Sequence, residues 1–161
     1  MGDMMARIRI RVRDNNNIPK LTRLLKDLKK YRLEVGVFGD GKDPDYAMIA
    51  SVHEFGMVIN TKKATINIPE RSFIRSTFDE KENEWYEFFK RQIKKAIISD
   101  SDAESVLGLL GERMVKDIRA KIRDLKDPPN APSTIAAKKS SNPLIATTGL
   151  RQRITYRVVS V

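Results

Sequence analysis

The spacing of apolar and polar positions changes along the chain between a period of two and a helical period. Near the start, isoleucine and valine alternate with arginine, which predicts a strand with four guanidinium groups on one face. After an asparagine-rich turn, leucines recur at helical spacing over residues 18–28. Residues 33–38 then read as a second strand, because a short apolar run ends at glycines. The four arginines of the first strand are Arg7, Arg9, Arg11 and Arg13.

The middle of the chain predicts two long helices. Over residues 72–98, an apolar stripe that includes Phe78 and Trp85 has helical spacing, with acidic residues early and basic residues late. The spacing of Ser101 and Glu104 fits a capping box that begins the next helix. A pair of prolines ends this second helix.

The remaining segments are shorter. Residues 44–54 read as a helix that Gly56 stops, and residues 57–68 as a loose hairpin or an extended loop. Residues 126–149 are rich in turn-forming residues with one short helical piece, and residues 150–161 read as a final strand.

Together these elements predict a single α+β domain over residues 1–161. Its small mixed or antiparallel sheet is expected to pack against the two long helices and the shorter ones. The turn-rich segment 126–149 is long for a compact domain, so we expect it to order fully against a neighbouring molecule.

Composition narrows the functional classes. The 161 residues carry 31 Lys and Arg against 21 Asp and Glu, a formal charge of +10. Both halves of the chain are basic, which argues against a polybasic tail. No cysteine is present, and His53 is the only histidine, so a cysteine nucleophile and a multi-histidine metal site are excluded. No apolar run approaches the roughly 20 residues that span a membrane, so no membrane partner is expected.

Candidate chemistry is weak throughout. Residues 36–43 match most of a phosphate-binding loop, but Asp43 stands where a hydroxyl must bind magnesium, so a turn is the better interpretation. His53 and Glu54 lack the second histidine of a zinc protease, and His53 is interpreted as a packed or hydrogen-bonding residue. We therefore expect no catalytic, cofactor-binding or metal-binding residues and no enzymatic activity.

Two features leave alternatives open. The arginine strand is either an edge strand that faces water or a surface for phosphates or an acidic partner. In the aromatic run from Trp85 to Phe89, Tyr86 and Phe88 point away from the core stripe. They are interpreted as subunit-interface residues or as core residues, with membrane-surface contact as a third and less attractive option.

Two separated motifs resemble phage tail-completion or neck proteins, a group that includes the virion-morphogenesis and minor-tail-protein-Z-like families. The first is IASVHEFG over residues 49–56 followed by IPERSFIR over residues 68–75, and the second runs from residue 129 to residue 158. The residues that match the motifs are His53, Glu54, Phe55, Gly56, Pro69, Arg71, Phe73, Pro132, Thr134, Lys138, Pro143, Leu144, Leu150 and Arg151.

The resemblance implies a non-enzymatic structural protein of the virion, made in the host cytoplasm. Such proteins complete the tail or neck and join the tail to the head connector as a homo-oligomeric ring, usually six-fold. The implied partners are further copies of the chain, other neck and connector proteins, tail-tube or terminator proteins, and packaged DNA in the channel. The alternative function is a nucleic-acid-binding domain without sequence specificity, which the charge favours although no recognised DNA-binding motif is present.

Overall fold

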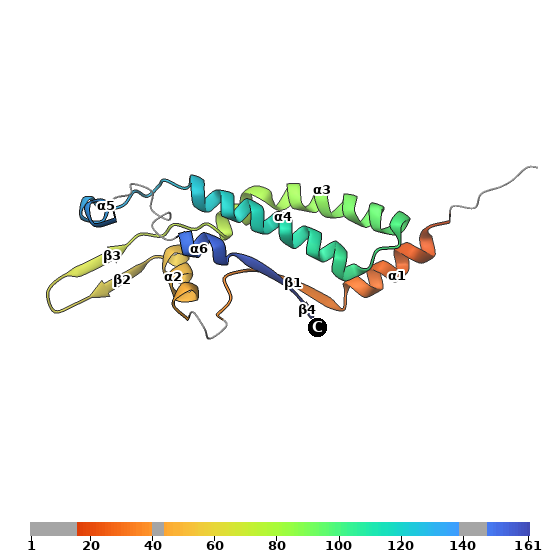
Figure 1. Ribbon diagram of the computed structural model, residues 1–161, viewed down its shortest axis with the longest axis horizontal. Coiled ribbons are helices and arrows are strands. Elements are labelled where there is room, and N and C mark those ends of the chain that lie inside the picture. The colour runs from red at the N-terminus through yellow and green to blue at the C-terminus, as the bar shows by residue number, and fades with distance from the viewer. Residues whose placement is uncertain (1–15, 40–43, 139–147) are drawn as a thin grey trace, which may run out of the picture.

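The computed structural model describes residues 16–39, 44–138 and 148–161, and it is elongated, with two long helices lying along its length (Figure 1). The α+β class is confirmed: within these residues the strands form two separate two-stranded antiparallel sheets. The predicted arginine strand lies outside the described residues. In chain order the elements are α1 (Ile18–Leu28), β1 (Tyr31–Gly36), α2 (Pro44–Phe55), β2 (Met57–Asn60), β3 (Thr65–Ile68), α3 (Arg75–Ser99), α4 (Ala103–Asp124), α5 (Pro132–Lys138), α6 (Thr148–Arg153) and β4 (Thr155–Ser160).

The first sheet pairs β1 with the last strand, β4, and α4 lies against one face of it. Close packing is possible because Gly111 of α4 has no side chain: a Cβ there would lie 2.5 Å from the ring of Tyr156. Glycine at this position therefore permits the close approach of α4 to the sheet. The predicted strand 33–38 is displaced, since β1 begins at Tyr31 and ends at Gly36.

The predicted pair of long helices is confirmed, but the turn between them differs from the prediction. Asp100 has a positive φ of 56° and ends α3. Asp102, and not Ser101, is the N-cap of α4, and its carboxylate accepts a hydrogen bond of 2.7 Å from the backbone N–H of Ser105. The prediction fails because two neighbouring residues both suit the N-cap position, and only the backbone conformation chooses between them.

Two buried clusters hold the body together. The larger contains Phe73 just before α3, Ile118 and Ile122 from α4, and Leu150 and Ile154 near the C-terminus. The smaller cluster joins α1 to the C-terminal end of α3 and the N-terminal end of α4. Phe78 departs from the predicted core stripe: it is 49% exposed and touches the edge of the Trp85 ring, with 6.0 Å between centroids.

The C-terminal prediction is corrected in part. The predicted strand 150–161 is divided, because Leu150 belongs to α6 and the strand itself begins at Thr155. Ile154, between α6 and β4, is fully buried, and like Leu150 it belongs to the larger cluster. The turn-rich segment contains α5, as predicted, although residues 139–147 lie outside the described part. No described helix is long and apolar enough to span a membrane.

Candidate functional site

The residues of the first motif meet at one junction between α2 and α3. Glu54 lies in the last turn of α2, and its side chain is directed at the start of α3, where backbone N–H groups have no partner within the helix. Its carboxylate accepts hydrogen bonds from the hydroxyl of Ser72 (2.7 Å) and from the backbone N–H groups of Phe73 (2.9 Å), Ile74 (3.0 Å) and Arg75 (2.9 Å). Glu54 thus caps α3 from another helix.

The charge state of Glu54 follows from these contacts. The residue is only 5% exposed, and burial by itself raises the pKa of a carboxyl group. The hydrogen bonds from Ile74, Arg75, Ser72 and Phe73 outweigh burial, so the pKa of Glu54 lies below its ordinary value. The ionised carboxylate also faces the positive end of the α3 dipole, which favours the charge.

Arg71 ties this junction to the chain beyond α4. Its guanidinium donates to the carbonyl oxygens of Pro128 (2.7 Å) and Pro129 (2.9 Å), and its side chain is buried together with Asn130. The backbone N–H of Arg71 donates to the carbonyl of His53 at 2.7 Å. One arginine therefore fixes two segments that are more than 50 residues apart in sequence.

The other residues of the first motif also serve the junction. Gly56 has a φ of 72°, and a Cβ there would lie 3.0 Å from the Ile68 carbonyl oxygen and the Glu70 nitrogen. Phe73 is fully buried. Phe55 is the exception: it is 62% exposed, with the Arg75 guanidinium over its ring at 4.6 Å.

The second motif is divided between the core and the surface. Leu150 is fully buried in the larger cluster, and Arg151 is half-buried beside α4. Pro132, Thr134 and Lys138 belong to α5, where the backbone N–H of Thr134 donates to the Ala131 carbonyl. Pro143 and Leu144 lie outside the described residues.

Between Gly56 and Pro69, β2 and β3 form a hairpin that extends from one end of the body (Figure 1). Cross-strand partners share a face, so Met57, Ile59, Ile66 and Ile68 form one apolar face, and Asn60 and Thr65 lie on the opposite, more polar face. Met57 is 43%, Ile59 38% and Ile66 50% exposed. We call residues 57–68 the hairpin arm. The sequence left a loose hairpin and an extended loop as alternatives, and the structure has the hairpin. The sequence analysis did not identify its exposed apolar face, although apolar and polar residues alternate in both strands after Gly56.

The predicted interface aromatics differ in exposure. Tyr86 is 61% exposed, with the Lys90 ammonium over its ring at 5.1 Å, whereas Phe88 is half-buried. Arg7, Arg9, Arg11 and Arg13 lie outside the described residues, as do residues 40–43 of the loop that resembles a phosphate-binding motif. In the described ranges, no three His, Asp or Glu side chains gather as metal ligands would.

Comparison of the chain with models of known families, with curated proteins and with solved structures gave no match. The site must therefore be interpreted from its own contacts. Most residues of the first motif form one hydrogen-bonded junction, and the exposed apolar residues beside it belong to the hairpin arm. An arm of this kind, held at its base, is suited to contact with another macromolecule.

Proposed function

We propose that the chain is a structural subunit of a phage virion that assembles with copies of itself into a ring and completes the tail or neck. The observation that carries this proposal is the hairpin arm, whose apolar face is exposed along both strands. Exposed apolar surface of this kind favours association with a partner. The partners proposed are further copies of the chain, then connector, neck, and tail-tube or terminator proteins.

The junction supports the same proposal. The residues of the first motif that resemble tail-completion proteins are mostly committed to holding α2, the arm and α3 in fixed relation. The charged groups of Glu54 and Arg71 are hydrogen-bonded mainly to backbone groups of other segments, which suits a structural role. Nothing in these roles requires a substrate, which favours a non-enzymatic subunit.

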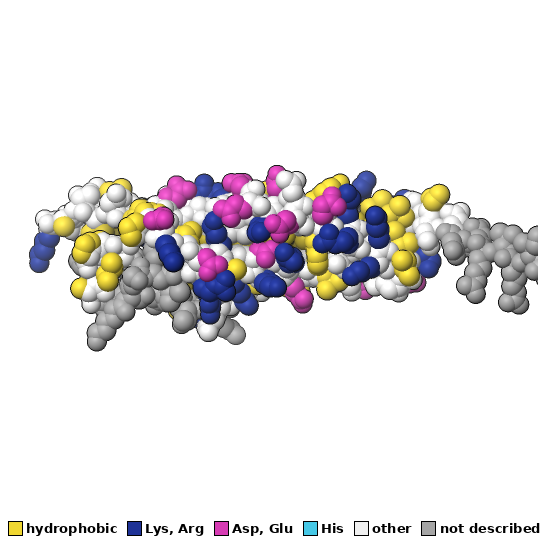
Figure 2. All heavy atoms as spheres, turned by 90° about the horizontal axis from the view of Figure 1, so that it is seen from above, with side chains coloured by type: hydrophobic (Ala, Val, Ile, Leu, Met, Phe, Trp, Pro, Cys, Tyr) yellow, Lys and Arg dark blue, Asp and Glu magenta, His cyan; other side chains and the backbone are white. Residues whose placement is uncertain are grey.

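The shape and the distribution of apolar residues favour contacts of the head-to-tail kind. Figure 2 shows hydrophobic side chains at both ends of the body and mixed charges between them. On α1 and the last turn of α3, Ile18, Leu25 and Ile98 are 70%, 43% and 80% exposed, and we call these three residues the end patch. A molecule with different apolar surfaces at its two ends forms heterologous contacts, which close into rings when the rotation allows.

The surface charges favour assembly over a domain that only binds nucleic acid. On α3 and α4, Lys81 pairs with Glu84 at 2.7 Å and Arg113 with Asp117 at 2.9 Å, so these two positive groups are balanced locally. The proposal assigns Arg7, Arg9, Arg11 and Arg13 to the channel with its packaged DNA or to an acidic ring partner.

The proposal is tested by measuring the mass and shape of the purified chain by light scattering and negative-stain electron microscopy. We expect rings, alone or after addition of tails that lack this subunit, and incorporation into those tails. A chain that stays monomeric and never joins tails or connectors contradicts the proposal. A monomer whose affinity for duplex DNA falls steeply with salt would establish the nucleic-acid-binding alternative instead.

A further inference from the structure

One groove between α4, α6 and β4 is lined by positive side chains. Lys116, Arg119 and Arg123 are three and four residues apart on α4, which places them on one face of the helix. Arg151 of α6 lines the same groove, which has a volume of about 730 Å³ and which we call the basic groove. The row of cations on α4 is about 10 Å long, because an α-helix rises about 1.5 Å per residue.

Most of these positive charges have no acidic partner. Arg123 is the exception, since its guanidinium donates to both carboxylate oxygens of Asp124, at 2.7 and 2.8 Å. In the part of the chain that the structure describes, Lys116, Arg119 and Arg151 form no ion pair with a carboxylate. The basic groove is therefore a surface of uncompensated positive charge, which attracts anions.

Arg119 is held in place by neutral groups. Its guanidinium donates hydrogen bonds to the backbone carbonyl oxygens of Gln152 (3.2 Å) and Ile154 (2.9 Å). A guanidinium group in a protein stays protonated, and carbonyl oxygens orient it without neutralising its charge. Arg119 therefore presents a positive charge in a fixed position, so that less side-chain freedom is lost when an anion binds beside it.

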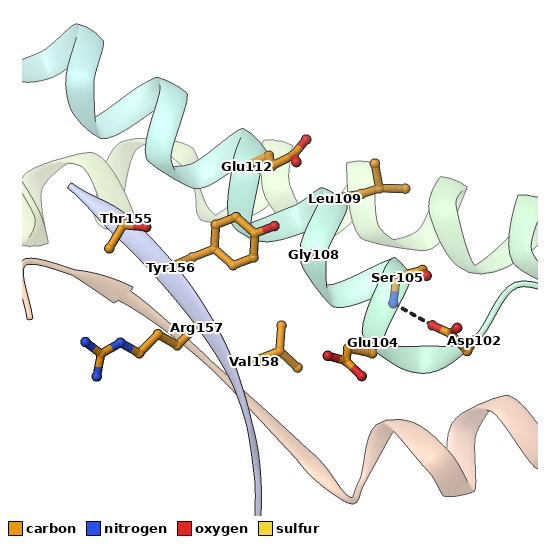
Figure 3. A pocket seen from close by; sticks show the side chains of 10 residues that line it. All are labelled: Asp102, Glu104, Ser105, Gly108, Leu109, Glu112, Thr155, Tyr156, Arg157 and Val158. Carbon is orange, nitrogen blue, oxygen red and sulfur yellow. Dashed lines mark hydrogen bonds between the residues drawn. The ribbon is translucent and has the colours of Figure 1, made fainter. Parts of the chain in front are cut away.

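The hollow next to the basic groove has the opposite charge (Figure 3). It lies at the start of α4, is lined by Asp102 and Glu104, and shares Glu112 and Tyr156 with the basic groove. Arg157 also lines this hollow, but in Figure 3 its side chain points away from α4. Because carboxylates repel phosphates, a polyanion would be confined to the basic groove, beyond Glu112.

We infer that Lys116, Arg119 and Arg151 bind phosphate groups of the packaged DNA, and that the basic groove faces the channel of the ring. This inference rests on the proposed function, which supplies both the ring and the DNA. One strand of duplex DNA carries about one charge per 3.4 Å of helix axis, so a row of about 10 Å meets about three phosphates. Phosphate contacts carry no sequence information, which suits a channel that every sequence passes through.

The lining of the basic groove favours a polyanion over a protein partner. Interfaces between proteins depend on apolar or aromatic side chains that anchor the partner. None of the described residues that line the basic groove is a large exposed apolar residue: Val115 is buried, and Ala120 and Tyr156 are half-buried. A row of cations along a helix also matches the repeated charges of a nucleic acid better than the single charge centre of a free phosphate.

The salt dependence of DNA binding tests the inference. With the full-length chain and a labelled duplex of mixed sequence, we expect Lys116→Gln with Arg151→Gln to weaken binding by about tenfold or more at low salt, measured by fluorescence anisotropy. The slope of log affinity against log salt should fall by about two. Lys94→Gln with Lys95→Gln, on the exposed side of α3, loses the same charge and is the matched control, with a slope change below about 0.5. Lys116→Gln alone, at an exposed position, should lower the slope by about one and does not depend on the folding of the Arg151 variant.

A cross-linking experiment locates the contact in the assembled particle. The chain has no cysteine, so a single introduced cysteine can carry a photo-cross-linker. Gln152 is exposed and lines the basic groove, and we expect Gln152→Cys to cross-link to DNA in tails that are joined to DNA-filled heads. Glu82→Cys, on the exposed side of α3, is the control and should not cross-link to DNA.

The outcomes separate this inference from the proposed function. Rings whose DNA binding is unchanged by Lys116→Gln with Arg151→Gln, or is weakened equally by the α3 control, overturn the inference and leave the proposed function standing. A cross-link from Gln152→Cys to protein and not to DNA overturns it in favour of an acidic ring partner. A chain that stays monomeric, yet loses DNA binding through the groove substitutions, contradicts the ring and supports the basic groove as a phosphate-binding surface.

Discussion

The junction and the hairpin arm are consecutive in sequence, yet they are opposite in environment. Glu54 and Arg71, on either side of the arm, are each 5% exposed and bonded to backbone groups of other segments. Between them every residue of β2 is exposed, and so is every residue of β3 except Ile68. Polar groups are thus buried in the junction while apolar groups face outward on the arm, the reverse of the usual distribution.

The junction therefore serves the folding of the monomer, whereas the hairpin arm serves association with a partner. The junction stabilises the monomer, because its buried charges are satisfied only when α2, α3 and the segment after α4 come together. The hairpin arm adds little buried area to the monomer, so its apolar face is available for a partner. Mutations in the two regions should therefore affect different measurements.

The largest effect is expected from Glu54→Ala, which leaves the N–H groups of Phe73, Ile74 and Arg75 without their acceptor. We expect a loss of about 3–5 kcal/mol in the free energy of unfolding, measured by urea denaturation of the monomer. Glu82→Ala, on the exposed side of α3, is the control and should change the value by less than about 0.5 kcal/mol. Equal effects of the two substitutions would show that Glu54 is not the cap of α3.

A smaller loss is expected from Arg71→Ala, which removes the donor shared by Pro128 and Pro129. We expect about 2–3 kcal/mol, together with faster amide hydrogen exchange at Asn130 and in α5. Arg71→Lys should recover only part of the loss, because one ammonium group does not reproduce the forked geometry of the guanidinium. Full recovery by lysine would contradict the assigned role.

The junction should also make stability depend on pH. Because the folded-state pKa of Glu54 lies below the ordinary value of 4.5, its contribution is complete above that value. It is lost as the pH falls through the folded-state pKa. We therefore expect Glu54→Gln to be less stable than the original chain at pH 7 and to lose less stability between pH 5 and pH 3. Parallel curves for the two proteins would contradict this expectation.

The smallest effect on folding is expected in the hairpin arm. Replacing Ile59 and Ile66 together by serine should lower the free energy of unfolding by only about 1–2 kcal/mol, because both side chains are already partly in water. Self-association should nevertheless weaken by about tenfold or more, measured by sedimentation velocity. Asn60→Ala on the opposite face is the control. A large loss of stability with unchanged association would reverse the comparison.

Much of the fold follows from short windows of sequence. The apolar spacing of α1, α3 and α4 is local, and each helix was predicted to within a few residues. Boundaries were less accurate where neighbouring residues compete: Asp102 replaces Ser101 as N-cap, and Leu150 is helical although its segment alternates like a strand. Leu150 is helical because its burial with Phe73 and Ile118 outweighs the local preference.

The sequence by itself determined the class of the fold, the two long helices and a hairpin or extended loop between the two halves of the first motif. Only the tertiary structure decided what the motif residues do, because the partners of Glu54 lie 18 to 21 residues away and those of Arg71 more than 50. The tertiary structure also decided which apolar residues stay exposed. Ile66 and Phe73 are both large apolar residues, yet Ile66 is 50% exposed and Phe73 is fully buried. Periodicity records which side of an element is apolar, whereas burial depends on what the rest of the chain places against that side.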